Sequence, residues 1–193
     1  MLLNAISITV LFVLIYKSEI YYPYSNISAF YDVEYYLSIA QKGYNLENPR
    51  LYAFMPLFPM VIRHLSIGSP ILFASLLNNV LLFFSSVLLY RIFKEIFLLE
   101  NQEALKSVAF FIFNPFRFVF FIPYTESLFI FLTLLSWYLW KKKANPWLWG
   151  LTLGMSILTR NLGAVLALCI GFISALAVIF SKEYKQIRYY CKA

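Results

Sequence analysis

The sequence predicts an all-α fold: a polytopic helical membrane protein with about six transmembrane helices and a long helical first loop outside the cytoplasm. Composition is the first reason, because 62% of the 193 residues are hydrophobic and only 13% are charged. A soluble domain of this size would have too little polar surface to cover itself. The second reason is that apolar runs of about the length needed to cross a bilayer recur along the chain. The third is that basic residues cluster beside these runs, so the formal net charge of +7 indicates membrane orientation rather than nucleic-acid binding.

The first apolar run covers residues 2–16, which is short for a span that needs about 20 residues. Lys17 can extend it by reaching the membrane surface. A signal peptide is the alternative, although the run lacks a preceding basic residue and a small-x-small cleavage site. Residues 17–69 follow with most of the concentrated polarity and with Pro and Gly at turn positions, so we expect a structured extracytoplasmic loop.

Further apolar runs then complete a single integral membrane domain over residues 1–193, with the remaining spans in residues 70–180 and a basic cytoplasmic tail in 181–193. Basic residues at the ends of alternate runs predict which ends are cytoplasmic. By alternation, the long first loop and the turns at Tyr124 and Arg160 lie on the opposite side. The remaining runs cover residues 70–93, 106–123, 124–140, 144–159 and 162–180.

The stretch FYDVEYYLSIAQKGYN (residues 30–45) places two carboxylates among tyrosines in an otherwise apolar chain. Its pattern predicts a helix over residues 29–42, with Ser28 as N-cap and Gly43 as the residue that ends it. At about 100° per residue, one face of this helix is apolar and the opposite face is polar. The predicted apolar stripe contains Val33, Tyr36, Leu37 and Ala40.

The two acids of this helix are not equivalent. Glu34 falls on the polar face, where we expect it to be solvated. Asp32 falls at the edge of the apolar stripe beside Tyr36, where solubility alone does not explain an acid. An amphipathic helix lying on the bilayer surface is an alternative interpretation of the whole segment.

Charged residues also lie within or at the ends of the apolar runs, where each costs about 2.5 to 3.5 kcal/mol at the bilayer centre. A helix over residues 144–160 would span about 25 Å of a roughly 30 Å core, which puts Arg160 just under the outer surface. There its guanidinium suits a lipid-linked phosphate, and we expect free backbone amides near Asn161 and Gly163.

Each of these charges also has a structural explanation. Arg160 can reach the headgroups or pair with Glu126. Glu126 opens a helix, where the helix dipole favours an acid. Arg117 either pairs outside this chain or reaches the same cavity as Arg160.

Four segments of the chain form an ordered set of motifs: YDVEYYLSIAQKGY (31–44), AFMPLFP (53–59), NPFRFVFFIPYTESLF (114–129) and TRNLG (159–163). In this order they resemble the mannosyltransferases of the GPI-assembly class V type, which add the second mannose in eukaryotes, and their prokaryotic relatives. Tyr31 replaces the tryptophan of the family pattern, Arg117 stands at a position that is usually small or apolar, and the turn after Arg160 reads Asn-Leu-Gly rather than Ser-Asn-Gly. The resemblance covers only the amino-terminal part of a family chain, which is much longer.

The resemblance implies a GT-C glycosyltransferase that moves a hexose, mannose in this family, from a polyprenyl (dolichyl) phosphate to a lipid- or protein-linked glycan with inversion. Asp32 occupies the place of the catalytic carboxylate and would act as general base. Arg160 and Asn161 would bind the donor phosphate. No metal site is expected, although one acid and the donor phosphate together could hold a divalent cation. The residues expected to bind or orient substrates are Glu34, Tyr35, Tyr36, Tyr124 and Glu126.

Two other functions stay open at this point: a non-catalytic membrane subunit or fragment of such an enzyme, and a transporter of a polar or lipid-linked solute. The expected partners are the sugar donor, a glycan or glycolipid acceptor, membrane lipid, and a second subunit or a carboxy-terminal half. Nucleic acid is not among them. The location would be the ER membrane in a eukaryote and the cell membrane in a prokaryote.

Overall fold

The computed structural model describes residues 32–114, 120, 122–173, 176 and 180, and this part of the chain is helical with no strand. The all-α class is therefore confirmed. The predicted first span, Ser28, Tyr31, Arg117 and the basic tail lie outside the described residues. The elements are α3 (Val33–Lys42), η1 (Pro49–Ala53), α4 (Leu57–Leu65), α5 (Pro70–Glu95), α6 (Asn101–Ile112), α7 (Glu126–Lys141) and α8 (Pro146–Thr159), followed by a helix over Leu162–Ile173.

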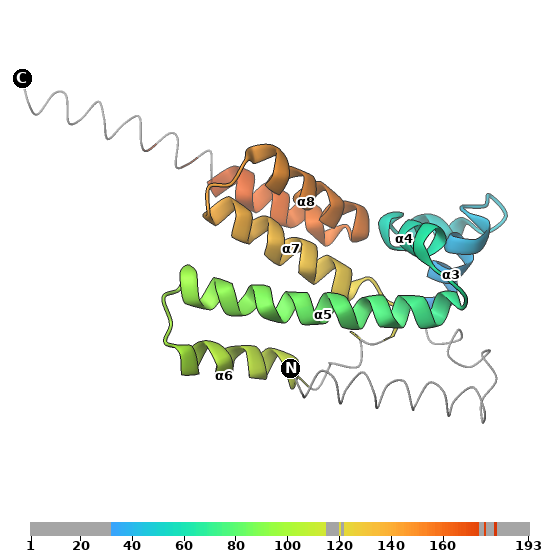
Figure 1. Ribbon diagram of the computed structural model, residues 1–193. Coiled ribbons are helices and arrows are strands. Elements are labelled where there is room, and N and C mark those ends of the chain that lie inside the picture. Colours follow the sequence, from blue (N-terminus) through green and yellow to red (C-terminus); the bar gives the residue numbers. More distant parts are fainter. Residues whose placement is uncertain (1–31, 115–119, 121, 174–175, 177–179, 181–193) are drawn as a thin grey trace, which may run out of the picture.

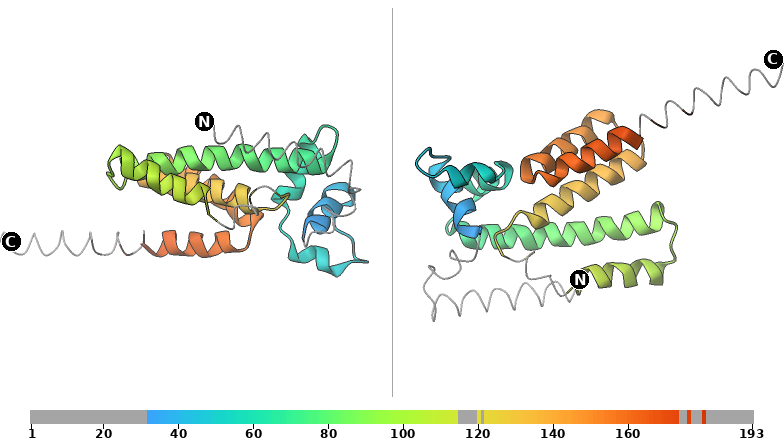
Figure 2. Two further views of the ribbon diagram at one scale, coloured as in Figure 1. Left: turned by 90° about the horizontal axis from the view of Figure 1, so that it is seen from below. Right: turned by 180° about the vertical axis from the view of Figure 1, so that it is seen from behind.

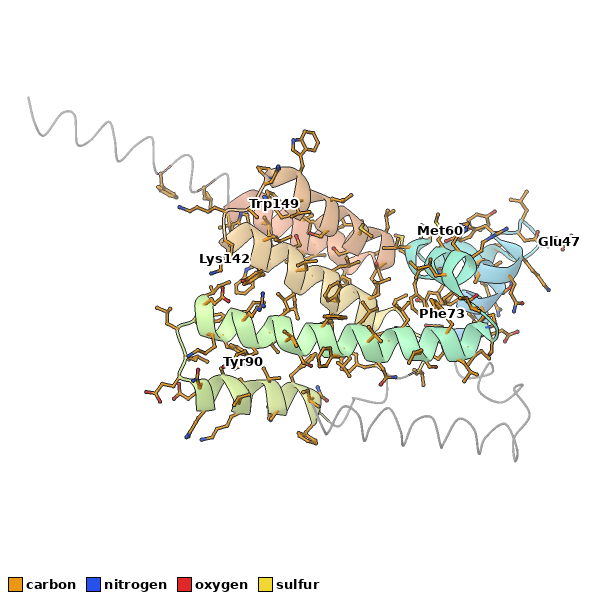
Figure 3. The ribbon with its side chains drawn as sticks, in the orientation of Figure 1. Glu47, Met60, Phe73, Tyr90, Lys142 and Trp149 are labelled. Atoms are coloured by element: carbon orange, nitrogen blue, oxygen red, sulfur yellow. The ribbon has the colours of Figure 1, made fainter. Side chains whose placement is uncertain are left out.

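The described helices form a group with two distinct ends. Figures 1 and 2 show α6 returning along one side of the long helix α5, α7 packing on another side of α5, and α8 packing against α7. At one end lie α3, η1, α4, the turn over residues 122–125 and the turn over residues 160–161; this is the head end. The opposite end holds the α5–α6 and α7–α8 connections and is the turn end. Figure 3 shows Met60 and Glu47 at the head end and Lys142 at the turn end.

The apolar stripe of α3 explains how the head end is built. The predicted residues Val33, Tyr36, Leu37 and Ala40 are buried, while Glu34 is exposed, so the predicted orientation of the helix is confirmed. This face packs against α4, with Tyr36 contributing to a core that also includes residues of α5 and α7. Protein rather than a lipid surface therefore covers the stripe. The core contains Tyr36, Ala40, Phe58, Ile62, Ala74, Leu81, Leu128 and Leu132.

The ends of α3 match the prediction at one terminus and differ at the other. Gly43 ends the helix with a φ of 80°, and its N–H donates to the Ile39 carbonyl at 2.9 Å. Glycine adopts this left-handed conformation without the clash that a Cβ would cause. The predicted helix included Asp32, but α3 begins at Val33 and Asp32 is its N-cap residue. Asp32 therefore flanks the amino-terminal end of α3 and is not one of its helical residues.

Among the described residues, one helix is both long and apolar enough to cross a membrane, the 26-residue α5. The predicted spans over 124–140 and 144–159 correspond to α7 and α8, which have 16 and 14 residues. At 1.5 Å per residue these helices cover about 24 and 21 Å of a roughly 30 Å core. The number of spans thus stays a prediction.

The predicted span over residues 106–123 is wrong in extent. α6 covers Asn101–Ile112, and the described residues between it and α7 form no α-helix. The sequence supplies the reason, since Asn114 precedes Pro115 and a residue before proline is disfavoured in helical conformation. The chain therefore enters α7 through an irregular segment at the head end.

Polar contacts join α5 to α7 at the turn end. Lys142 Nζ lies 2.6 Å from Glu95 Oε2, and the Tyr138 hydroxyl donates to the same oxygen at 2.8 Å. Just beyond α7, Lys143 takes a left-handed φ of 54°, which lets the chain turn back into α8. These contacts hold α5 and α7 together at the turn end, away from the head end.

Candidate functional site

A cavity of about 250 Å³ lies at the head end. Four of the residues singled out in the sequence line it: Asp32 and Tyr36 from the start of α3, and Arg160 and Asn161 from the turn after α8. The structure thus brings two distant segments of the chain to one hollow. The other lining residues are Ala53, Phe54, Met55, Thr159 and Leu162.

Asp32 lines the cavity with an exposed carboxylate. The residue occupies the N-cap position of α3, yet its side chain makes no capping hydrogen bond. Its carbonyl oxygen instead accepts a bond from the Tyr36 N–H at 3.2 Å. Since the carboxylate is not used to cap its helix, it can accept a proton or a hydrogen bond from a molecule in the cavity.

Arg160 leaves α8 at the cavity wall. It is the C-cap residue, with an extended backbone at φ −152° and ψ 142°. Its guanidinium Nη1 donates to Glu126 Oε1 in an ion pair, and both side chains are only partly exposed. Among the described residues, the structure gives Nη2 and Nε no acceptor. The arginine is thus anchored at one nitrogen and keeps donors for a further anion.

Gly163 makes the turn after Arg160 possible. A Cβ at this position would lie 2.6 Å from the Ile157 backbone nitrogen, closer than real Cβ contacts. Only glycine therefore lets the next helix pass this close to α8. The Gly163 N–H donates to the Arg160 carbonyl at 2.9 Å, so the expectation of a free amide there is wrong.

Glu126 reaches Arg160 from another helix. It is the first residue of α7, where the helix dipole favours an acid, and the pairing that the sequence left open is present. Its second oxygen, Oε2, is buried and has no hydrogen-bond partner in the described part of the chain. The carboxylate therefore orients Arg160 from beside the cavity, since it is not a lining residue.

Aromatic rings support the cavity wall. Tyr36 is buried and packs edge-on against Phe54 and Phe58, with ring centroids 5.1 and 5.6 Å apart. Burial raises the pKa of the Tyr36 phenol, so its hydroxyl stays protonated at neutral pH. Tyr35 does not line the cavity but stacks on Phe54, which does, at 4.9 Å.

The structure places two further candidates away from the cavity. Glu34 is exposed on α3, and Tyr124 packs, partly buried, against the core of the head end. Neither contributes to the lining. Sequence reasoning also missed the wall over residues 53–55, although these residues open the segment AFMPLFP that carries part of the family resemblance.

Metal-ligating residues are sparse in the described part of the chain. No group of three or more His, Cys, Asp or Glu side chains there could hold a metal ion. Among the described residues, Asp32 is the one acid that lines the cavity.

The fold and the cavity together define an all-helical protein with a long apolar helix and an acid and an arginine in one hollow. The sequence matches the family described as Mannosyltransferase (PIG-V) over residues 17–192, and the chain belongs to this family. GPI mannosyltransferase 2 of Drosophila pseudoobscura pseudoobscura is 33% identical over 113 residues. The match covers 52% of this chain and 24% of that relative, so the chain spans about a quarter of its length. No solved structure matches. The resemblance noted in the sequence is thereby confirmed.

Proposed function

We propose that this chain carries the donor site of a multi-pass membrane mannosyltransferase. The enzyme transfers mannose from a polyprenyl (dolichyl) phosphate to a lipid- or protein-linked glycan with inversion at the sugar carbon. One observation carries the proposal: Asp32 and Arg160, from opposite parts of the described chain, line the same cavity. The family membership supports the class of reaction.

Asp32 is the proposed general base. Its exposed carboxylate takes the proton from an acceptor hydroxyl while the oxygen attacks the sugar carbon. The phosphate leaves from the opposite face of the sugar, so one displacement inverts the configuration. A cavity of about 250 Å³ suits one sugar ring rather than an oligosaccharide. The acceptor glycan therefore lies largely outside it, at the exposed side of Asp32.

Arg160 is the proposed phosphate ligand, with Asn161 beside it. A guanidinium binds phosphate through paired N–H groups and stabilises the charge that develops on the leaving group. The ion pair with Glu126 uses Nη1, which holds the group in place without consuming its other donors. Glu126 is thus a positioning residue in this proposal. Tyr36 forms part of the wall that faces the sugar.

Glu34, Tyr35 and Tyr124 take less direct roles in the proposal. Glu34 is exposed on the same helix as the wall residue Tyr36 and can contact the acceptor outside the cavity. Tyr35 supports Phe54 by stacking. Tyr124 precedes the start of α7 and helps to place Glu126. A divalent cation between Asp32 and the donor phosphate is compatible with this arrangement.

A membrane location places the site where a lipid-linked donor can reach it. Large apolar side chains are exposed along the helices that follow the first loop, as expected for surfaces that face lipid. Basic residues gather at the turn end, which supports a cytoplasmic location for that end and a location of the head end on the other side. The proposed membrane is that of the ER in a eukaryote and the cell membrane in a prokaryote. Examples of the exposed side chains are Leu76, Phe84, Phe110, Leu151 and Leu168.

The full protein or complex that contains this chain is the material for the test. Membranes carrying it are assayed for mannose transfer from a polyprenyl-phosphate donor to a glycolipid acceptor. The Asp32→Asn variant should insert normally and lose transfer, whereas unchanged transfer would remove Asp32 from the mechanism. If the protein without substitutions shows no mannose transfer, a non-catalytic subunit is favoured instead.

A further inference from the structure

Two adjacent buried asparagines in the apolar helix α5 make different contacts. Asn78 is 0% exposed, and its Nδ2 donates to the carbonyl oxygens of Ile122 and Tyr124 at 2.6 and 2.9 Å. Asn79 is 5% exposed, and its Nδ2 donates to the Ser75 carbonyl of its own helix at 2.8 Å. Asn78 thus joins two elements, whereas Asn79 joins none.

Asn78 supplies two donors to the backbone of the turn over residues 122–125. This segment is not helical, and Pro123 at its centre has no N–H. The Tyr124 N–H bonds tightly to the Ile122 carbonyl at 2.7 Å. Both bonds to Asn78 are part-buried, and a carbonyl shielded from water destabilises the fold when it lacks a donor. Because both acceptors are oxygens, only the amide NH₂ of Asn78 can face them, and a carboxylate of the same shape cannot.

This turn leads directly to the site. Tyr124 is followed by the buried N-cap residue Thr125 and then by Glu126, the first residue of α7. Glu126 pairs with Arg160, which lines the cavity. Continuous contacts therefore run from Asn78 inside α5 to the arginine at the end of α8.

We propose that Asn78 is a positioning residue for the donor site. Its side-chain amide fixes the turn over residues 122–125, and the turn holds the start of α7 so that Glu126 stays against Arg160. The kinetic part of this inference rests on the proposed function, while its geometric part does not.

The geometric part is tested by cross-linking in the full protein in membranes, with Cys169 and Cys191 replaced by serine. Cysteines introduced as Glu126→Cys and Arg160→Cys are joined by a short bis-maleimide. Adding Asn78→Asp should slow this cross-link about tenfold, because the turn loses both donors. Adding Asn79→Asp should change the rate by less than about twofold. Equal rates with and without Asn78→Asp would overturn the proposal.

A second cysteine pair separates local from global disruption. Glu95→Cys and Lys142→Cys replace the ion pair that joins α5 and α7 at the turn end. This cross-link should keep its rate in Asn78→Asp. If both pairs stop reacting, Asn78→Ser is used, since its hydroxyl can still donate to one carbonyl. The proposal is supported if Asn78→Ser slows cross-linking between the cysteines at positions 126 and 160. It is rejected if the rate of this cross-linking is the same with and without Asn78→Ser.

The kinetic part is tested in the transfer assay. Asn78→Asp should raise the KM for the polyprenyl-phosphate donor about tenfold and leave the acceptor KM within about twofold. Asn79→Asp should leave both values near those of the unaltered enzyme. Equal increases in both KM values for Asn78→Asp would show a general structural role instead. An enzyme without any transfer activity would defeat the proposed function, and the cross-linking result would still decide the role of Asn78.

Discussion

The two ends of the helical group carry the same kind of ion pair in different surroundings. At the turn end, Lys142 and Glu95 have side chains 43% and 37% exposed, and they join α7 to α5 at the surface. At the head end, Arg160 and Glu126 are 36% and 24% exposed, and they join α8 to α7 beside a cavity. Exposed pairs contribute little because water screens them and long side chains lose freedom. In the proposed function the head-end pair orients Arg160 for binding the donor, whereas the turn-end pair has no role beyond joining α5 and α7.

The largest expected effect comes from Asp32, the acid that lines the cavity. Asp32→Asn should lower the transfer rate by about 10² to 10⁴-fold, the usual contribution of a general base. The thermal unfolding midpoint should not change, because the carboxylate makes no cap bond and is exposed. Transfer assays and thermal unfolding of the solubilised protein check both parts. Glu103→Gln on the exposed face of α6, an acid away from the cavity, is the matched control and should retain most activity.

Arg160 should give the next largest effect. Arg160→Lys keeps the charge but loses the forked donors, so the KM for the donor should rise about tenfold to a hundredfold. The acceptor KM should change much less. Steady-state kinetics with each substrate varied in turn provides the measurement. Equal increases in both KM values would argue against phosphate binding by this residue.

Gly163 tests whether the turn after Arg160 shapes the site. Gly163→Ala forces a Cβ to within 2.6 Å of the α8 backbone and should cost about 1 to 3 kcal/mol of stability. It should also raise the donor KM, because Arg160 shifts with the turn. Gly154→Ala, in open space on α8, is the control and should be neutral or slightly stabilising. Thermal unfolding of the two variants compares them directly, and equal midpoints would contradict the close approach.

The smallest expected effect belongs to the turn end. Lys142→Gln removes the exposed partner of Glu95 and should leave the transfer rate within about twofold of the unaltered enzyme. The same assay that detects the loss in Arg160→Lys measures it. If Lys142→Gln lowers the transfer activity as much as Arg160→Lys does, the two ends do not differ in function as proposed.

Sequence patterns predicted the features that depend on local chemistry. The apolar stripe of α3 and the stop at Gly43 follow from periodicity and from the conformational freedom of glycine. The pairing of Arg160 with Glu126 was open, because a charge near the end of a span can reach headgroups as easily as a partner. The early end of α6 could also have been predicted, because a residue before proline, here Asn114, is disfavoured in a helix. The prediction instead followed the apolar run, which continues past this proline.

Features that depend on long-range packing could not be predicted. The bridge from Asn78 to residues 122 and 124 exists only once α5 and the turn before α7 lie together. The close approach of Gly163 to the α8 backbone likewise depends on how the two helices pack. The wall over residues 53–55 carries no titratable group, so nothing in its chemistry marked it as part of a site.

The most direct measurement is protection of the cavity by the donor lipid. Ala53, which is exposed and lines the cavity, is changed to cysteine in the full protein with Cys169 and Cys191 replaced by serine. Labelling of this cysteine by a maleimide should slow when a polyprenyl phosphate is added, and Arg160→Gln should abolish the protection. Labelling at the same rate with and without the lipid would contradict a shared donor cavity for Asp32 and Arg160.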